Sequence, residues 1–434
     1  MHNVLDLRDI VPDEAEQLAH SGYHVGNLLD AARRAAAIAD YPALSAIADQ
    51  LKGLQRSAPW PFDEPDEMAD IVATIPALQR FPVADGSIRA RIHGAWLGRC
   101  VGNTMGKPIE SLTRTEVSIY LRAVDQWPQR GYVPLLPELP DGVSHLHESA
   151  PEASAGLFTD VPRDDDLDWT ILALALAERY GRDLTTDDIA REWLDRLPFT
   201  QTFTAERAAY RNLIHGFAAP ETARVDNPYR EWIGALIRAD MYGYLNPGDP
   251  VTAARAALAD ARLSHLGNGI YGEMWAAALV AIALSVDTVR PALEAALSVL
   301  PPRSRLAQSQ MQLLALHASG ASSERALDWV DSELGHYNWV HTINNAALIA
   351  LGLLWGTGFV TSVALTISGG RDTDSNAATV GSVFGALHGI ASIPADLVGT
   401  THHRVRSAVR GFDRIEITEL ADRTLALLGT GHVG

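Results

Sequence analysis

The sequence has few of the features that mark secreted, membrane-spanning or nucleic-acid-binding proteins. Cys100 is the single cysteine, which excludes a disulfide framework and permits a reducing compartment. Apolar runs such as 274–286 stay short of the roughly 18–20 residues that a membrane span needs, and the N-terminus lacks the basic and apolar regions of a signal peptide. Acidic residues outnumber basic ones by 53 to 35, so the basic footprint of a nucleic-acid-binding protein is missing. We therefore expect a cytoplasmic protein with no nucleic-acid and no membrane partner.

Alternating β-branched stretches are also scarce, whereas alanine- and leucine-rich segments with a helical period recur along the chain. Examples lie at 31–54, 170–180, 252–261, 273–284, 289–299, 323–334, 345–354 and 415–428. We predict an all-α fold, with a compact multi-helix domain over 88–434. An N-terminal helical extension and a proline-rich connector occupy 1–87, with one short helix near Met68–Leu78.

A long segment at 127–163 contains six prolines and several glycines and serines. A structureless loop of that length inside a compact domain is uncommon, and is often functional or disordered. Because this segment leads directly into an acidic cluster at Asp164, two interpretations stay open. It is either a lid over a site or a passive excursion on the surface.

Residues 369–376, Gly-Gly-Arg-Asp-Thr-Asp-Ser-Asn, place two carboxylates and a hydroxyl within four residues. Hard cations such as Mg²⁺, Mn²⁺ or Ca²⁺ prefer oxygen ligands of this kind. Asp372 and Asp374 would diverge on a regular helix, so they converge only if the helix begins at about this point. The alternative is an acidic helix N-cap, where Asp and Ser are common.

A second acidic cluster, Asp164-Asp165-Asp166-Leu167-Asp168, precedes an apolar helical segment. The helix macrodipole stabilises acidic residues in a first turn, but this accounts for one or two of them rather than four in five positions. Adjacent like charges raise one another's pKa unless a cation neutralises them. Two such clusters, each opening an apolar helix, predict a site that holds one or two metal ions between helices.

Glycines also recur at every fourth position from 94 to 106, and again at 381, 385 and 389. A glycine inside a helix costs roughly 1 kcal/mol relative to alanine, so four in register imply a compensating gain. A glycine stripe lets a second backbone approach closely, and we expect both stripes in one tight central bundle. Packing does not account for Glu110, which follows Pro108 where the helical pattern ends and is a candidate carboxylate of the site.

Together these motifs resemble the ADP-ribosylglycohydrolase family, which includes dinitrogenase reductase-activating glycohydrolase. In order they are Gly-x3-Gly-x3-Gly-x3-Gly-x-Pro-x-Glu, an aspartate run opening an Ala/Leu helix, and Gly-Gly-x-Asp-Thr-Asp-Ser. The resemblance covers roughly residues 88–400. It implies an all-α ADP-ribosylglycohydrolase-like domain with two Mg²⁺ or Mn²⁺ ions. It also implies hydrolysis of an N- or O-glycosidic bond to ADP-ribose, carried by a protein side chain or by a small molecule.

The resemblance implies metal ligands at Asp164, Asp165, Asp166, Asp372, Asp374 and Ser375. The sequence departs from the family pattern at three places. Ser375 replaces a threonine, Asp164 stands where the family has a threonine, and Asn103 replaces the usual aspartate after the third glycine. Because the helix after the aspartate run is offset by about one turn, an alternative register would use Asp168.

The resemblance further implies catalytic carboxylates at Glu110, Asp165 and Asp166, with Glu110 as general base or holder of the attacking water. Substrate contacts are expected from Gly369, Gly370, His265, Asn268 and Asn345. For Asn268, a capping or turn role in the loop before an apolar helix is an equal alternative, and for His265 a structural role is favoured over ligand contact. Asn345 either touches a ribose or a phosphate or satisfies buried backbone.

The leading hypothesis is thus metal-dependent hydrolysis of a glycosidic bond to ADP-ribose. Three alternatives stay open. The first is a hydrolase of a small N-ribosyl metabolite, and the second is a non-enzymatic ADP-ribose-binding relative. The third is a class I isoprenoid synthase, because Asp164-Asp165-x-x-Asp168 satisfies the aspartate spacing of that family.

Overall fold

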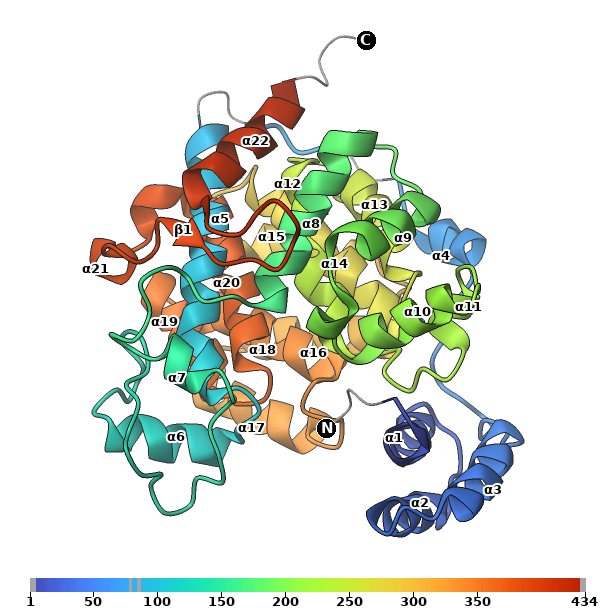
Figure 1. The fold of residues 1–434 in the computed structure, drawn as a ribbon. Coiled ribbons are helices and arrows are strands. Elements are labelled where there is room, and N and C mark those ends of the chain that lie inside the picture. The colour runs from blue at the N-terminus through green and yellow to red at the C-terminus, as the bar shows by residue number, and fades with distance from the viewer. Residues whose placement is uncertain (1–4, 78–79, 84–86, 430–434) are drawn as a thin grey trace.

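The computed structural model describes residues 5–77, 80–83 and 87–429. Over these residues the chain consists almost wholly of helices packed around one another (Figure 1). Its two named strands, β1 (Arg404–Val405) and β2 (Ile415–Glu416), form a short antiparallel pair. The predicted all-α, multi-helix class is confirmed. Among the described residues, no helix is long and apolar enough to cross a membrane.

The helices are numbered in chain order. The first four are α1 (Leu7–His20), α2 (Leu28–Ala37), α3 (Tyr41–Lys52) and α4 (Met68–Thr74). The main body contains α5 (Ile88–Gly106), α6 (Arg114–Ala123), α7 (Ala150–Ala153), α8 (Asp165–Tyr180), α9 (Thr186–Arg196), α10 (Thr204–Ile214), α11 (Glu221–Arg224), α12 (Asp240–Tyr244), α13 (Pro250–Ala261), α14 (Asn268–Ala283), α15 (Val289–Ser298), α16 (Arg305–Ala318), α17 (Ser323–Leu334), α18 (Thr342–Trp355), α19 (Phe359–Ser368), α20 (Thr373–His388), α21 (Ala395–Val398) and α22 (Ile417–Gly429). Short 3₁₀ helices are η1 (Lys107–Ile109), η2 (Phe199–Gln201), η3 (Ile233–Arg238) and η4 (Ile390–Ser392).

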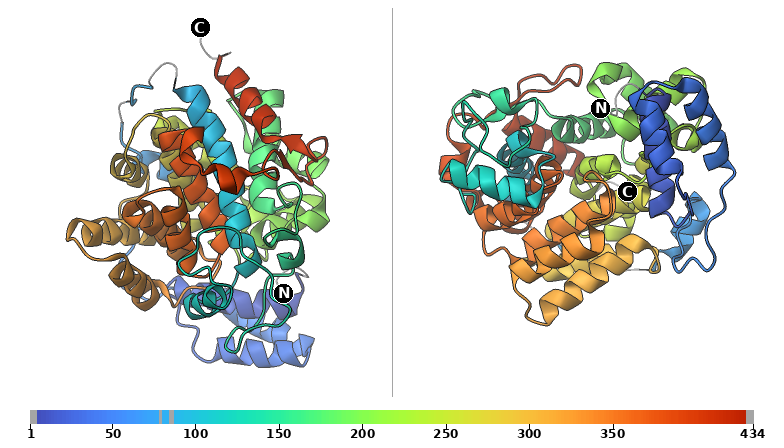
Figure 2. Two further views of the ribbon diagram at one scale, coloured as in Figure 1. Left: turned by 90° about the vertical axis from the view of Figure 1, so that its left-hand side faces the viewer. Right: turned by 90° about the horizontal axis from the view of Figure 1, so that it is seen from below.

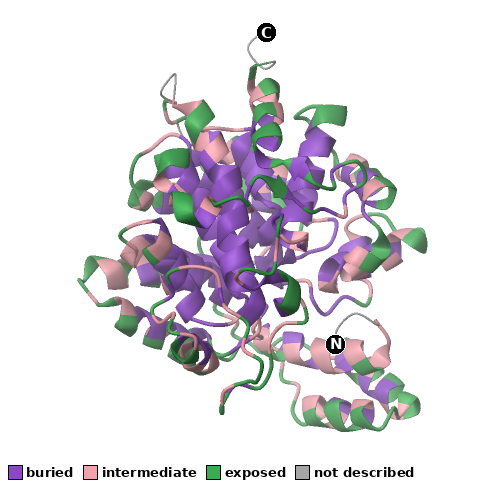
Figure 3. Cartoon of the chain, turned by 60° about the vertical axis from the view of Figure 1, so that its left-hand side comes forward, coloured by how far each residue is buried: buried purple, intermediate pink, exposed green. Residues whose placement is uncertain are grey.

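Helix α14 lies at the centre of the main body and is buried along its whole length. Its sequence is apolar or small on nearly every side, and a helix without a polar face must be enclosed by other elements. Helices α12, α13 and α15 and the η3 turn pack around it. Figure 3 shows buried residues filling the main body, whereas α1, α2 and α3 carry mostly intermediate and exposed residues.

Helices α5 and α20 pack against each other antiparallel through their glycines. A Cβ added at Gly98 or Gly102 would overlap the backbone of α20, and a Cβ added at Gly381 or Gly385 would overlap the backbone of α5. This close approach offsets the cost of glycine inside a helix, which is roughly 1 kcal/mol for each residue. The expectation that both stripes belong to one tight bundle is confirmed. As a result, the end of α5 is fixed beside the beginning of α20.

Helices α1, α2 and α3 share a small hydrophobic cluster, separate from the main core. The helical pattern at 31–54 contains two helices rather than one. Helix α2 ends at Ala37, Ala39 adopts a left-handed φ of 55°, and Asp40 caps α3 by accepting a hydrogen bond from the Ala43 N–H. The short connector helix is present as α4, which ends at Thr74. Its predicted end near Leu78 lies outside the described residues.

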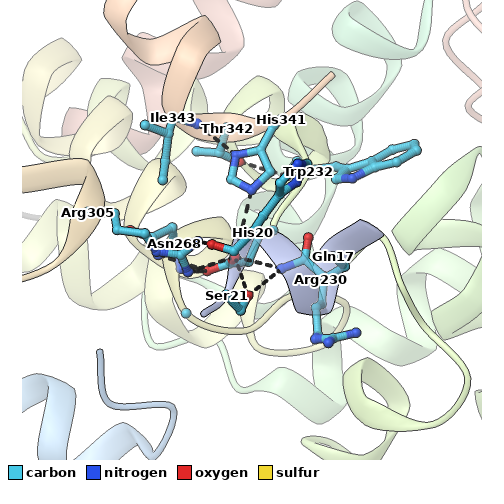
Figure 4. A network of polar contacts seen from close by, with 12 residues as sticks. Gln17, His20, Ser21, Arg230, Trp232, Asn268, Arg305, His341, Thr342 and Ile343 are labelled. Carbon is cyan, nitrogen blue, oxygen red and sulfur yellow. Dashed lines mark hydrogen bonds and ion pairs between the residues drawn. The ribbon is translucent and has the colours of Figure 1, made fainter. Parts of the chain in front are cut away.

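Helix α1 docks on the main body through a buried polar network (Figure 4). Gln17 Nε2 donates to Glu231 Oε2 at 2.7 Å, and Arg305 Nη2 binds the same carboxylate at 2.7 and 2.9 Å. Arg305 also pairs with Glu64 of the connector at 2.8 Å and donates to the backbone oxygen of His20 at 2.9 Å. One guanidinium therefore ties both the connector and α1 to the main body. Figure 2 shows the first three helices along one side of the molecule. The division of the chain at residue 87 stays a prediction.

Candidate metal centre and pocket

The first half of the site comes from the α5–α20 contact. A Cβ added at Gly106 would overlap the backbone of Thr373, and the Thr373 hydroxyl donates to the Gly106 oxygen at 2.9 Å. The η1 turn after Gly106 therefore places Glu110 beside Asp372 and Asp374 at the start of α20. Asp372 stands at the N-cap position, but its side chain makes no capping hydrogen bond. Helix capping thus does not account for this carboxylate.

The second half of the site comes from the start of α8, which is anchored on α5. Arg99 Nη2 donates to the backbone oxygen of Asp166 at 2.8 Å, and Asn103 Nδ2 donates to Asp166 Oδ2 at 2.9 Å. Asp164 is the N-cap of α8, and its Oδ1 accepts a hydrogen bond from the Asp166 N–H at 3.0 Å. Capping therefore accounts for one oxygen of Asp164, but not for Asp165 or Asp166.

The two acidic clusters meet. One carboxylate oxygen from each of Asp164, Asp166 and Asp374 lies within 4.8 Å of the others, and the same holds for Glu110, Asp372 and Asp374. Asp374 belongs to both groups. Within the described residues, Oδ1 of Asp166, of Asp372 and of Asp374 is buried without a hydrogen-bond partner. Buried oxygens that lack donors suit hard divalent cations, so the residues present fit the ions that the resemblance implies.

Lys107 lies between the two groups. Its Nζ is 2.5 Å from Asp164 Oδ2, 2.9 Å from Asp374 Oδ2 and 3.2 Å from Glu110 Oε2. Burial lowers the pKa of Lys107, but the three carboxylates raise it more, so the pKa stands well above its usual range. Burial raises the pKa of Asp164, yet Lys107 lowers it below its usual range. The pKa of Glu110 is raised well above normal by burial and by Asp374, against the lowering effect of Lys107.

The remaining carboxylates are not neutralised by this one ammonium group. Burial and the neighbouring Asp164 raise the pKa of Asp165 to about 7. Burial and acidic neighbours also raise the pKa values of Asp166 and Asp372 well above their usual range. Carboxylates in this state favour the binding of cations, because a cation stabilises the ionised form.

A cavity of about 780 Å³ opens over the acidic cluster. Part of its wall comes from the irregular segment 127–163, including His145 and His147. His147 Nε2 is 3.4 Å from Glu110 Oε2, and the His147 N–H donates to the Pro108 oxygen at 3.3 Å. The segment therefore borders the cavity instead of lying apart on the surface. Phe203, Trp232 and Trp339 are also among the residues that line the cavity.

Asp168 does not take part in the cluster. Its Oδ2 pairs with Arg163 at 2.7 Å, and its Oδ1 accepts from the Ser407 hydroxyl at 2.7 Å and from the Ala408 N–H at 3.0 Å. Both oxygens are therefore engaged in holding the 404–408 segment against α8. Asp164 and Asp166 belong to a carboxylate group that could hold an ion, Asp165 lines the cavity outside both groups, and Asp168 is engaged elsewhere. The aspartate spacing of an isoprenoid synthase loses its third member for the same reason. The choice of ligands among 164–168 stays a prediction.

The predicted site residues divide into two sets. Those that line the cavity are Glu110, Asp164, Asp165, Asp166, Asp372, Asp374 and Ser375. The five residues predicted to contact substrate lie outside its lining. Gly370 has a φ of 67°, and a Cβ there would overlap the backbone around Leu112, so this glycine serves the approach of the 111–113 loop to α20. Gly369 packs beneath Leu348.

The other three are buried behind the cavity wall. His265 Nδ1 contacts the Ser264 hydroxyl at 2.8 Å. Asn268 Nδ2 donates at 2.8 Å to Glu64 and at 2.8 Å to Glu231, so Asn268 belongs to the network beneath α1. Asn345 donates to backbone oxygens at 2.8 and 2.9 Å and accepts from Asn376 at 2.7 Å. Direct substrate contact by these side chains is not supported by their positions, which match the structural alternatives instead.

The cavity residues that the sequence did not predict include Lys107, His147, Trp232 and Trp339. Lys107 stood inside the glycine motif, and its position between Gly106 and Glu110 was the available signal. His147 lies in the segment proposed as a lid. The two tryptophans carried no signal, because nothing in their local sequence distinguishes a cavity wall from a core.

Known proteins resemble this chain in sequence pattern and in structure. A family model described as ADP-ribosylglycohydrolase matches residues 84–432. The search of curated proteins gave no match. A solved structure described as an ADP-ribosylglycohydrolase-related protein complex is similar, with 18% sequence identity and a TM-score of 0.46. That alignment covers 79% of this chain and 98% of the other.

Proposed function

Because this chain belongs to the ADP-ribosylglycohydrolase family, we propose that it hydrolyses the glycosidic bond between ADP-ribose and a protein side chain or small molecule with the help of divalent cations. Family membership supports glycohydrolase activity on ADP-ribose conjugates. The observation that carries the metal dependence is the pair of carboxylate groups that share Asp374 at the base of the cavity. Mg²⁺ or Mn²⁺ suits such ligands, which are all oxygen.

Asp164, Asp166 and Asp374 would hold one ion, and Glu110, Asp372 and Asp374 a second. Ser375, which also lines the cavity, offers a further oxygen. When bound, such ions orient hydroxyl groups and polarise water or the bond to be cleaved. The protein's own contribution is to fix these oxygens at the junction of three helices, α5, α8 and α20, where the glycine contacts leave little freedom.

Glu110 is the proposed general base. Its side chain is 16% exposed and reaches the cavity, whereas Asp166 and Asp374 lie deeper. A base must be ionised to accept a proton from water. Because burial and Asp374 raise the pKa of Glu110, Lys107 at 3.2 Å and the bound cations together would have to favour its ionised form. Departure of the leaving group gives the anomeric carbon oxocarbenium character, which nearby carboxylates such as Asp165 and Asp166 stabilise.

Substrate binding is assigned to the cavity wall. Trp339 lines the cavity and is partly exposed, so its aromatic ring suits stacking with an adenine base, whereas Trp232 is 4% exposed and packs on Tyr229. His147 lies next to Glu110, with its Nε2 at 3.4 Å from Glu110 Oε2. In this proposal the ribose would lie over the carboxylates and the adenine base against Trp339.

An activity assay tests the proposal. Purified protein is incubated with ADP-ribosylated arginine, serine and nucleobase substrates, first in EDTA and then with Mg²⁺ or Mn²⁺, and released ADP-ribose is measured by chromatography. We expect release from at least one substrate only when the ion is present. Asp374→Asn should remove most of the turnover, whereas Asp49→Asn, at a carboxylate that is 77% exposed on α3, should not.

Three other outcomes would contradict the proposal. Equal release in EDTA would contradict the metal dependence. Cleavage of small ribosyl compounds without an ADP group would point to a hydrolase of N-ribosyl metabolites. Tight binding of ADP-ribose without any release would point to a non-enzymatic relative.

A further inference from the structure

Lysine is nearly absent from this protein. Of its 35 basic residues only two are lysines, Lys52 and Lys107, and all the others are arginines. Lys52 is 71% exposed and its ammonium lies 3.8 Å from Asp49 on the surface of α3. Lys107 is the opposite case, with a side chain that is 9% exposed and lies inside the acidic cluster.

The position of Lys107 coincides with that of the candidate cations. Its three carboxylate partners are Asp374, which both groups share, Asp164, which belongs to one group, and Glu110, which belongs to the other. An ion in either group would therefore take oxygens from residues that the ammonium already binds. It would also approach a buried positive charge, and the repulsion between like charges would lower the affinity for the ion.

The chemistry of the side chain supports this role. A lysine ammonium is a compact point charge with three donors, whereas an arginine guanidinium is planar and carries its donors in a fixed fork. The three oxygens around Nζ come from three separate segments of the chain, the 107–110 turn, α8 and α20. Such an arrangement suits a small, nearly spherical cation and does not suit a planar fork.

We propose that Lys107 is an internal cation of the acidic cluster, and that divalent ions bind in competition with its ammonium group. The inference rests on the proposed function in one respect, because it assumes that the cluster binds metal. In the metal-free protein Lys107 holds Asp164, Asp374 and Glu110 together. When an ion binds, the ammonium gives up at least one of these carboxylates, so the affinity for metal is set by Lys107 as well as by the ligands.

The scarcity of lysine provides a direct readout in the unaltered protein. Protein labelled with ¹³C at the lysine Cε gives signals from only two lysine side chains, and Lys52 is the internal control. Titration with Mg²⁺, which is diamagnetic, should shift the Lys107 signal and leave the Lys52 signal in place. A Lys107 signal that does not move when Mg²⁺ binding is complete by calorimetry would overturn the inference.

Substitution gives the second, quantitative test. Lys107→Met keeps the length of the side chain and removes the charge, and Lys52→Met is the matched control. The Mn²⁺ affinity of each variant is measured by calorimetry and by the loss of the free-ion signal in electron paramagnetic resonance. Lys107→Met should bind Mn²⁺ at least roughly tenfold more tightly than the unaltered protein, a difference of about 1.4 kcal/mol, and Lys52→Met should match the unaltered protein.

The same variants separate stability from metal binding. Without metal, Lys107→Met should melt at a lower temperature than the unaltered protein, because its carboxylates lose their internal cation, and Mn²⁺ should raise that temperature by more than in the unaltered protein. Unchanged or weaker Mn²⁺ binding by Lys107→Met would overturn the inference while leaving the metal site in place. Absence of Mn²⁺ binding by both proteins would overturn the metal dependence itself. If Lys107→Met does not fold, the Mg²⁺ titration of the unaltered protein decides.

Discussion

The glycine contact between α5 and α20 allows a sharp test of how the fold builds the site. Gly94 and Gly106 lie at opposite ends of the same contact, about 18 Å apart at 1.5 Å per residue. A Cβ on Gly94 would come within 2.6 Å of the Gly389 carbonyl carbon, and a Cβ on Gly106 within 2.6 Å of the Asp374 nitrogen. Ordinary contact begins at 3.4 Å, so either alanine substitution must push the helices apart locally by at least about 0.8 Å, the difference between 3.4 and 2.6 Å. The shift at Gly106 is larger, because its Cβ would lie closer still to the Thr373 carbonyl group.

The two substitutions should have similar effects on stability and different effects on the site. Overpacking lowers the stability by about 1–3 kcal/mol, and the better helix propensity of alanine offsets roughly 1 kcal/mol of this loss. Metal ligands tolerate displacements of only about 0.2 Å. A local shift of 0.8 Å beside Asp374 exceeds this limit, whereas the same shift at Gly94 lies remote from the carboxylates.

We therefore expect Gly106→Ala to weaken Mn²⁺ binding roughly 10- to 100-fold, the range seen when groups that orient metal ligands are lost. Gly94→Ala should stay within about threefold of the unaltered protein on the same scale. Calorimetric titration with Mn²⁺ gives the affinities, and thermal denaturation without metal gives the stabilities. Equal losses of Mn²⁺ affinity in the two variants, or no loss in Gly106→Ala, would refute the argument that the glycine contact positions the ligands.

Three further predictions concern single residues of the site and its surroundings. Glu110→Gln should lower turnover roughly 10²- to 10⁴-fold, the usual size of general-base catalysis, while ADP-ribose affinity measured by calorimetry changes much less; equal losses in both would make Glu110 a binding residue. Burial raises the folded-state pKa of Asp165 to about 7, so its ionisation costs stability at any pH above the unfolded-state pKa. Asp165→Asn should therefore raise the melting temperature of the metal-free protein at about pH 7.5. This advantage should shrink as the pH falls from about 7 towards 4. A variant that is less stable than the unaltered protein at about pH 7.5 would contradict this. Gln17→Leu should raise the KM for an ADP-ribosyl substrate several-fold without changing Mn²⁺ affinity, and kinetics with a parallel Mn²⁺ titration would decide.

Local sequence was sufficient for the elements that carry the cluster. The carboxylates at 164–166 and 372–374 each directly precede or open an apolar helix, so their place at helix starts followed from pattern alone. Their convergence was predicted from the need of two carboxylate clusters for a shared cation, and the two glycine stripes predicted the close approach of α5 and α20. The position of Glu110 followed from the same contact.

Partners from distant parts of the chain could not be predicted. Asp168 looks like a member of the cluster in sequence, but Arg163 and Ser407 engage both of its oxygens. Asp240 lies two residues after Arg238 in the sequence, yet it pairs at 3.0 Å with Arg99 on α5. In each case the counterion of a buried charge lies on another element of the fold, and the local sequence does not indicate which element that is.

The wall of the cavity connects the N-terminal extension to the candidate site. Two short extended segments pair with each other, since the Ile233 N–H donates to the Val340 oxygen at 2.9 Å. Trp232 and Val340 line the cavity. Their neighbours Glu231 and His341 take part in the network beneath α1, where His341 Nε2 lies 3.7 Å from Glu231 Oε2 (Figure 4). The same backbone is thus held from behind by the extension and presented to the ligand in front. A change behind the wall should move the aromatic ring of Trp232 and leave the carboxylates on α8 and α20 in place, so it should alter substrate affinity and spare metal affinity.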